Sequence, residues 1–195
     1  MFKEQQFWKW FGNNSDRLFQ LEEEYRDKIF RELSKQLHKV NTGLAFAFSN
    51  IKENGKREFV VSADGNKKLF TKVLKLVETA PSFDLWEIVA FRQPVGCFDV
   101  NLRNRILKCS DVYFIPLDEG HKIGLDLFIQ NYDGSDACKH ACIIMLDSIL
   151  GEYDVEMKIG SIHFNKYDVR SADLEVISID KLYELVQEFK KYSEN

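Results

Sequence analysis

The sequence predicts an α+β protein made of two ββαβ units, with a mainly antiparallel sheet, helices packed on one face, and extra helices at both ends. The main observation is that one pattern occurs twice. A strand-like run, an Asp-Gly and a helix-like run follow one another in EFVVSADGNKKLF (Glu58–Phe70) and in LFIQNYDGSDACKH (Leu127–His140). A shift of 69 residues places the first Asp-Gly on the second. The chain therefore repeats the order of its elements.

The same shift also aligns the apolar positions of the two predicted helices, so that Val73 falls on Cys142 and Leu76 on Met145. A shared phase means that each helix turns the equivalent face to its sheet. A structural duplication explains this pattern, and so do two similar units that arise from ordinary α+β packing. We predict a single compact domain over residues 1–195, in which residues 43–92 and residues 111–165 form two pseudo-repeats.

Two helices are predicted before the first unit, within residues 2–40. A short helix that ends near Gly12 is indicated by four aromatic residues: Phe7, Trp8, Trp10 and Phe11. Ser15 can cap a second helix, whose apolar residues continue at steps of three and four as far as Val40. This regular spacing predicts one continuous helix from Ser15 to Val40.

The first unit begins with a predicted hairpin. The runs TGLAFAFS and KREFVVSA flank Asn54 and Gly55, and Asn-Gly between two β-prone runs is a strong hairpin signal. After Asp64 the apolar spacing changes to three and four, which predicts a helix that ends before Pro81. The run LWEIVAF then predicts a buried strand.

The second unit is predicted in the same order. The runs DVYFIPL and KIGLDLFIQ flank DEGH, which indicates a hairpin, and a helix follows that Gly151 closes. YDVEMKIGSIHF predicts a long strand or a bent pair of strands, because Gly160 favours a bulge. Before this unit, FDVNLRNRILKC fits either a strand or a short helix. A last helix is predicted over residues 178–192.

The composition argues against several classes of function. Lys and Arg number 27 against 31 Asp and Glu, which gives a formal net charge of −4, so the chain lacks the basic surface of a nucleic-acid binder. The start, MFKEQQFWKWFGNN, does not resemble a signal peptide, and no run approaches the roughly 18 apolar residues that span a bilayer. We therefore expect a cytoplasmic protein whose four cysteines stay reduced: Cys97, Cys109, Cys138 and Cys142.

Reactive side chains are densest in DACKHAC. Cys138 and Cys142 lie four residues apart and could ligate one metal, but their face of the helix continues as the apolar stripe, so we interpret both as core residues. The sequence indicates no metal site and no cofactor, and it contains no HExxH, GxSxG, P-loop or dinucleotide fingerprint. One hypothesis is nevertheless a hydrolase or other enzyme that uses His140 or His163 with Asp136 in a cleft between the two units.

The first hypothesis is instead a non-enzymatic protein-binding or regulatory module. Charged residues within apolar strand patterns indicate a polar sheet face that a partner could use, and those of interest are Arg92, Glu156 and Lys158. Trp8 and Trp10 would either pack in the core or form a partner-binding patch. A third hypothesis places small anions at the two Asp-Gly helix starts, although an Asp there repels an anion and caps the helix itself.

Three segments resemble a family of small, uncharacterised bacterial proteins known as a domain of unknown function: GKREFVVSADG (Gly55–Gly65), WEIVAFRQP (Trp86–Pro94) and GEYDVEMKIGSI (Gly151–Ile162). The likeness covers roughly Gly43 to Phe164. The resemblance implies a bacterial cytosolic protein, and it supplies no catalytic residue or cofactor. It also implies an association with regulators of ribonucleases.

Overall fold

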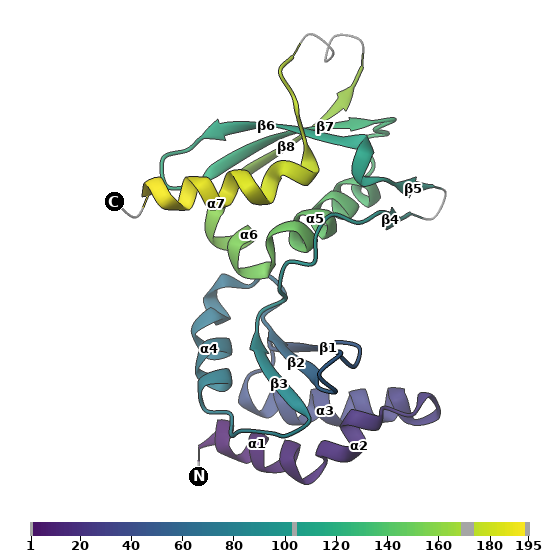
Figure 1. Cartoon of the computed structure of the whole chain (residues 1–195), viewed down its shortest axis with the longest axis vertical. Coiled ribbons are helices and arrows are strands. Elements are labelled where there is room, and N and C mark those ends of the chain that lie inside the picture. Colours follow the sequence, from purple (N-terminus) through teal and green to yellow (C-terminus); the bar gives the residue numbers. More distant parts are fainter. Residues whose placement is uncertain (1, 103–104, 169–173, 194–195) are drawn as a thin grey trace. The chain divides into compact units, whose positions relative to one another are not determined.

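The chain divides at Arg92 into two units, residues 1–92 and residues 93–195. The computed structural model describes residues 2–102, 105–168 and 174–193, and Figure 1 shows its helices and strands. The α+β class that the sequence predicts is confirmed. Where one domain was expected, each unit has its own sheet, of three strands in the first unit and four in the second, and the second unit adds a two-stranded ribbon.

The first unit begins with three helices, α1 (Lys3–Asn13), α2 (Ser15–Gln20) and α3 (Arg26–Val40), and the short 3-10 turn η1 (Glu23–Tyr25) precedes α3. The prediction of one continuous helix from Ser15 to Val40 is wrong, because α2 ends where Leu21 adopts the left-handed conformation, with φ 41°. The spacing of apolar residues does not reveal this break, because the buried residues follow the same pattern before and after Leu21. These buried residues are Leu18, Ile29, Leu33 and Leu37.

The sheet of the first unit has the order β1-β2-β3. Strand β1 (Ala45–Phe48) pairs antiparallel with β2 (Arg57–Ser62), as the Asn-Gly signal predicts. After the turn η2 (Lys67–Leu69), helix α4 (Phe70–Glu78) leads to β3 (Trp86–Ala90), which runs parallel to β2. The last strand is parallel because the helix returns the chain to the end of the sheet at which β2 started.

Aromatic side chains fill the core of the first unit. Phe59 of β2 is fully buried, and its ring lies 4.8 Å from that of Phe11 and 6.1 Å from those of Phe7 and Trp8, measured between centroids. These three residues of α1 are buried. The aromatic segment near the N-terminus therefore packs on the sheet.

The second unit contains the ribbon β4 (Val100–Asn101) and β5 (Ile106–Leu107), and the hairpin β6 (Val112–Asp118) and β7 (Ile123–Gln130). Short turns, η3 (Cys109–Asp111) and η5 (Ile179–Lys181), precede β6 and α7. The other elements, in chain order, are α5 (Asp136–Leu150), α6 (Glu152–Lys158), β8 (Ile159–Tyr167), β9 (Ile177–Ser178) and α7 (Leu182–Ser193). The main sheet has the order β8-β7-β6-β9, and β8 runs parallel to β7.

The prediction that YDVEMKIGSIHF is all strand is wrong in its first half, which forms α6. Gly151, with φ 79°, ends α5 and begins α6, and the following Glu, Met and Lys residues favour a helix. Val155 of α6 is buried. The shift of 69 residues therefore no longer aligns equivalent elements after α5, because the second unit contains an additional helix. It places Glu87 of β3 on Glu156 of α6.

The two crossover helices α4 and α5 both bury the residues that the shift aligns. Val73 is 0% exposed and Cys142 is 1% exposed. In each unit an antiparallel pair, a helical connection and a parallel strand follow one another. Both of these sheets are therefore mixed, and four of the six strand pairings among the described residues are antiparallel, in agreement with the predicted mainly antiparallel arrangement.

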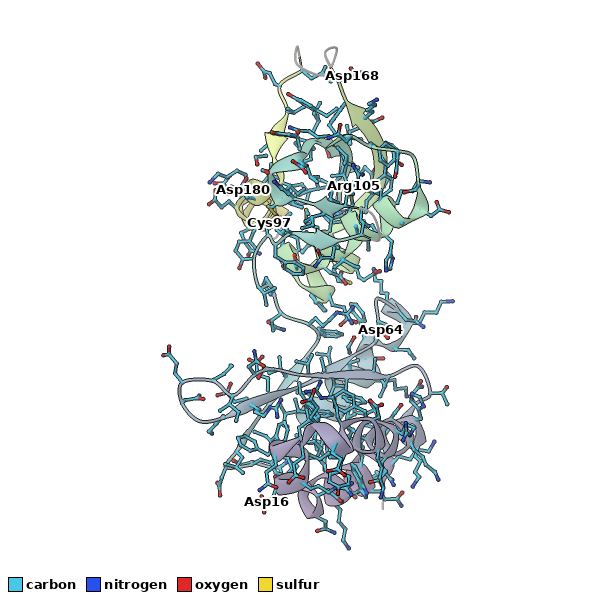
Figure 2. All side chains as sticks on the ribbon, turned by 90° about the vertical axis from the view of Figure 1, so that its right-hand side faces the viewer. Asp16, Asp64, Cys97, Arg105, Asp168 and Asp180 are labelled. Atoms are coloured by element: carbon cyan, nitrogen blue, oxygen red, sulfur yellow. A yellow bond between two sulfur atoms is a disulfide. The ribbon has the colours of Figure 1, made fainter. Side chains whose placement is uncertain are left out.

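The expectation of four reduced cysteines is wrong for one pair, because Cys97 and Cys109 form a disulfide with their Cα atoms 5.9 Å apart (Figure 2). The ribbon of β4 and β5 brings the two residues together, and the sequence pattern in this region did not reveal that ribbon. Cys138 and Cys142 are free and buried. Among the described residues, no helix is long and apolar enough to cross a membrane.

Candidate functional site

Among the residues that the structure describes, no helix lies on one face of the main sheet in the second unit. Figure 1 shows α5, α6 and α7 on the other side of β6, β7 and β8. Side chains alternate along β7, and the fully buried row is Leu125, Leu127 and Ile129, which packs in one cluster with residues of α5 and α7. The alternate row, which includes Asp126 and Phe128, therefore points to the open face.

Aromatic side chains gather at one end of this open face. The rings of Tyr113 on β6 and Tyr167 on β8 are stacked, with centroids 4.9 Å apart and an angle of 24° between their planes. Phe128 on β7 lies opposite Tyr113 in the strand register and is buried. Both tyrosines are half-buried. We call these three residues, Tyr113, Phe128 and Tyr167, the aromatic strip.

An acid–imidazole pair lies beside the aromatic strip. Asp126 and His163 are partners in the parallel register of β7 and β8, and Asp126 Oδ1 lies 2.8 Å from His163 Nδ1. When Nδ1 carries the proton, the Nδ1–H group donates a hydrogen bond to the carboxylate and Nε2 keeps its lone pair. The His163 side chain is 58% exposed, whereas that of Asp126 is 31% exposed. The carboxylate thus fixes the ring while leaving it accessible.

A second carboxylate anchors the hairpin that joins β6 and β7. Glu119 accepts hydrogen bonds from the backbone N–H of Ser161, at 3.2 Å, and from its hydroxyl. These bonds hold the pKa of the Glu119 carboxyl below its usual value. A Cβ atom at Gly160 would collide with this carboxylate, so the glycine leaves it room.

Lys122, on the same hairpin, donates to the backbone carbonyls of Glu156, at 3.1 Å, and Ile159, at 2.7 Å. A cation at this position interacts favourably with the carbonyl groups near the C-terminus of α6. Together with the Glu119–Ser161 bonds, it ties the hairpin to the start of β8.

The three residues of the enzyme hypothesis all lie in the second unit, on two different elements. Asp136 lies at the start of α5 and pairs with Lys139 at 3.0 Å, and His140 is exposed on the same helix. His163 lies on β8, where its carboxylate partner is Asp126. A sequence pattern cannot show this pairing, because it depends on the register of two parallel strands with an irregularity near Ile123.

The three charged residues that were predicted to form a polar sheet face lie in different units: Arg92 in the first, and Glu156 and Lys158 in the second. Arg92 donates to Ser62 Oγ at 2.9 Å and pairs with Asp64 at 2.7 Å, all within the first unit. Glu156 and Lys158 lie on α6 instead of on a strand, so neither contributes to the open sheet face.

The two predicted binding tryptophans both lie on α1. Trp8 is 3% exposed, and its indole N–H donates to the carbonyl of Leu76 at 2.8 Å. Trp10 is half-exposed. Trp8 therefore belongs to the core, and only Trp10 offers part of its ring to a partner.

The cysteine cluster of α5 has the environment of a core. Burial raises the pKa of the Cys142 thiol to about 12, and it also raises the pKa of the Cys138 thiol. Arg105 Nη2 lies 3.2 Å from the Sγ atom of Cys138. A thiol with such a high pKa is a poor nucleophile and a poor metal ligand. Among the described residues, no group of three or more His, Cys, Asp or Glu side chains could hold a metal ion.

The two Asp-Gly helix starts are occupied by the chain's own groups. Asp64 pairs with Arg92, and Asp133 accepts from the backbone N–H of Ser135 at 2.9 Å. Hydrogen bonding by the side chain of Ser135, and then by its backbone N–H, lowers the pKa of Asp133. The N-cap of α5 is Ser135, whose hydroxyl accepts from the N–H of Cys138 at 3.2 Å. These contacts fit capping rather than anion binding.

A pocket of about 310 Å3 lies near Asp64 in the first unit. Polar groups from α3 and the residues after it line one side, and they include Ser34, His38 and Thr42. Asp64 also lines this pocket, and its carboxylate pairs with Arg92 at 2.7 Å.

Comparisons with protein-family models, with curated proteins and with solved structures find no match to this chain. The resemblance over Gly43–Phe164 therefore stays a hypothesis, and the functional argument depends on the residues themselves.

Proposed function

We propose that this protein is a non-enzymatic binding module, and that the open face of its second sheet is the surface that contacts a partner protein. The observation that carries the proposal is the aromatic strip beside the Asp126–His163 pair, on a sheet face that none of the described helices covers. An antiparallel or mixed sheet commonly packs one face on its core and leaves the other to solvent. Aromatic residues are less common on a solvated face than at an interface.

The aromatic strip supplies the apolar part of such an interface. Tyrosine rings offer a large contact area, lose few rotatable bonds on binding, and keep a hydroxyl for hydrogen bonding. Tyr113 and Tyr167 already hold each other by stacking, so little conformational entropy remains to be lost. This preorganisation favours binding of a partner.

The Asp126–His163 pair supplies the polar part. His163 is exposed and its ring orientation is fixed by the carboxylate, so it can donate or accept one directed hydrogen bond. Directed polar contacts at the rim of an apolar patch chiefly provide specificity.

Quantitative affinity capture from a lysate of the source cells tests the proposal. The double variant Tyr113→Thr/Tyr167→Thr keeps β-favouring residues and removes both stacked rings. Capture of the partner that wild type retains should fall by about tenfold or more, because interface aromatics that act as hot spots contribute about 2 kcal/mol or more. His163→Ala should weaken capture to a smaller degree.

Tyr183→Thr is the matched control, since Tyr183 is an exposed tyrosine on α7, away from the open face. Circular dichroism melting of each variant should first show that it folds. Equal capture by wild type and by a folded double variant would contradict the proposal.

A second candidate function, hydrolysis, is favoured by one observation. Asp126 orients His163, and Ser161 lies two residues earlier on β8, so an acid, an imidazole and a hydroxyl occur close together. This candidate ranks second because Ser161 donates its hydroxyl to Glu119 and because His163 is largely exposed to water. Ester and phosphoester substrates should be turned over by wild type and by His121→Ala but not by His163→Ala if this candidate is right.

A further inference from the structure

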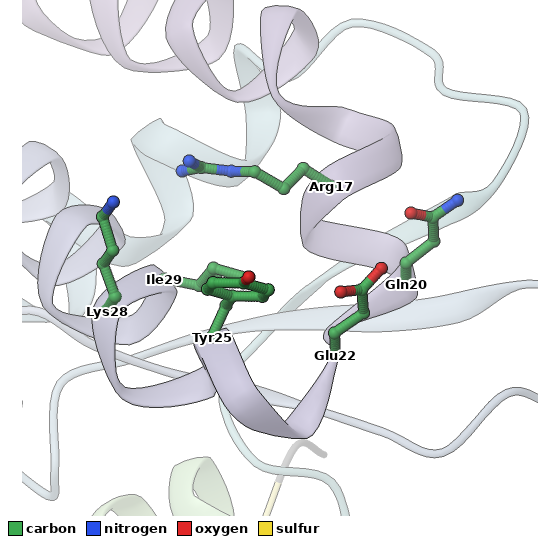
Figure 3. A pocket seen from close by; sticks show the side chains of 6 residues that line it. All are labelled: Arg17, Gln20, Glu22, Tyr25, Lys28 and Ile29. Carbon is green, nitrogen blue, oxygen red and sulfur yellow. The ribbon is translucent and has the colours of Figure 1, made fainter.

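A pocket of about 300 Å3 lies where the predicted long N-terminal helix is broken. The left-handed Leu21 ends α2 and lets α3 leave in another direction, so side chains from both sides of the break face one space. Figure 3 shows its six lining residues: Arg17, Gln20, Glu22, Tyr25, Lys28 and Ile29. The pocket lies entirely within the first unit and is separate from the open sheet face.

The pocket has an apolar floor and two polar ends. Ile29 is buried, and Tyr25 is 47% exposed and presents its ring toward the space. Lys28 stands on one side of Tyr25, while Gln20 and Glu22 stand on the other (Figure 3). The arm of Arg17 extends across the pocket, so that its guanidinium lies toward the side of Lys28 (Figure 3). One end is thus cationic and the opposite end accepts hydrogen bonds.

Arg17 is held in this position by Glu32 of α3, with which it forms an ion pair through Nη2. Arg17 holds the pKa of the Glu32 carboxyl below its usual value, so the pair persists at neutral pH. A guanidinium has five N–H donors, and the bond to Glu32 engages one of its nitrogens. Arg17 is therefore fixed in orientation and retains donors for a ligand.

We propose that this pocket binds a small, flat aromatic molecule with an anionic group at one end and N–H donors at the other. The ring would lie on Tyr25 beneath the arm of Arg17, in the stacked arrangement that aromatic rings and guanidinium groups favour. The anionic group would lie between Arg17 and Lys28, where charge-assisted hydrogen bonds are strongest. The N–H donors would reach Glu22 and Gln20. The volume of the pocket lies at the lower end of the range for small-molecule sites.

Protein-observed NMR titration of the full chain tests this inference with four probes. 4-Aminobenzoate has all three features and guanosine monophosphate has them on a larger body, whereas benzoate lacks the N–H donors and aniline lacks the anion. We expect 4-aminobenzoate or guanosine monophosphate to bind with a Kd of about 1 mM or below, with shifts at Tyr25 and Lys28. Benzoate and aniline should each bind at least about tenfold more weakly than the better of the two full probes.

Single substitutions separate the contributions of individual pocket residues to ligand binding. The affinity for the probe that binds should fall by about tenfold or more in each of three variants: Arg17→Gln, Lys28→Gln and Tyr25→Leu. The control is Glu24→Gln, which should leave the affinity unchanged, because Glu24 is an exposed residue of η1 that does not line the pocket. Lys28 is exposed, so its substitution leaves the fold intact even if another variant unfolds. Failure of both full probes to bind wild type, or equal binding by wild type and Lys28→Gln, would overturn the inference.

Discussion

Truncation of Trp8 should destabilise the first unit strongly, because this residue joins α1 to both α4 and the sheet. The indole is 3% exposed, donates to the Leu76 carbonyl at 2.8 Å, and lies within 6.1 Å of the Phe59 ring between centroids. Replacement of a buried tryptophan by alanine costs about 3–5 kcal/mol of unfolding free energy. We expect Trp8→Ala to fall in this range.

Trp8→Phe should cost less, about 1–2 kcal/mol, since it keeps most of the ring and loses one hydrogen bond. The Leu76 carbonyl also accepts from Thr79 Oγ1 at 2.9 Å, so the variant does not leave that acceptor unpaired. The difference between the two variants therefore measures packing rather than an unsatisfied polar group.

Urea unfolding followed by tryptophan fluorescence is the appropriate assay. All three tryptophans, Trp8, Trp10 and Trp86, belong to the first unit, so the signal reports that unit alone. Trp10→Ala is the matched control, because Trp10 is half-exposed, and it should cost less than half as much as Trp8→Ala. A cost below about 1 kcal/mol for Trp8→Ala would refute the packing of α1, because such values are typical of substitutions outside a core.

Three further predictions concern the second unit. Ser135→Ala should lower its stability by about 1 kcal/mol in urea unfolding followed by backbone circular dichroism, because it removes the N-cap of α5, and Ser135→Asn should restore most of the loss. Ser161 lowers the folded pKa of Glu119, so this carboxylate stabilises the protein above its unfolded pKa of about 4.3, and the contribution is lost as pH falls through the lower folded value. Glu119→Gln should therefore reduce the acid dependence of stability in that window, and an unchanged pH profile would contradict the account. Because burial raises the pKa of Cys142 to about 12, iodoacetamide at pH 8 should not modify it in the folded protein, whereas it should react after unfolding in urea, as mass spectrometry can show.

Local signals in the sequence were sufficient for most individual elements. The Asn-Gly at Asn54 and the DEGH turn predicted both hairpins, and the spacing of apolar residues predicted α4 and α5 with the correct buried faces at Val73 and Cys142. These features depend on neighbours in the chain, and residue periodicity reports such neighbours directly.

The errors occurred where the chain changes direction without changing its apolar pattern. Leu21 breaks the predicted long helix, although the spacing of buried residues continues across it. A left-handed L-residue costs about 1–2 kcal/mol, and the packing of buried residues on both sides of the break offsets this cost. In α6, the alternation of apolar residues around Val155 matched a strand, and Gly151 before it was interpreted as a helix end only. The disulfide depends on a ribbon of two-residue strands, too short to leave a periodic signal.

The candidate site could be predicted only in part. An open sheet face was expected from the charges within the strands, but two of the three residues chosen for it, Glu156 and Lys158, belong to a helix. The groups that the structure places there, Asp126 with His163 and Tyr113 with Tyr167, come together through the register of separate strands. A single sequence does not determine such a register.

The most direct measurement of the proposed function is site-specific photo-crosslinking in living source cells. A photoreactive phenylalanine analogue would replace Tyr167 on the open face in one protein and Tyr183 on α7 in another. The account predicts one discrete crosslinked partner protein at position 167, and a much weaker product at position 183. Equal crosslinking at both positions, or none at 167 in a protein that folds normally, would contradict it.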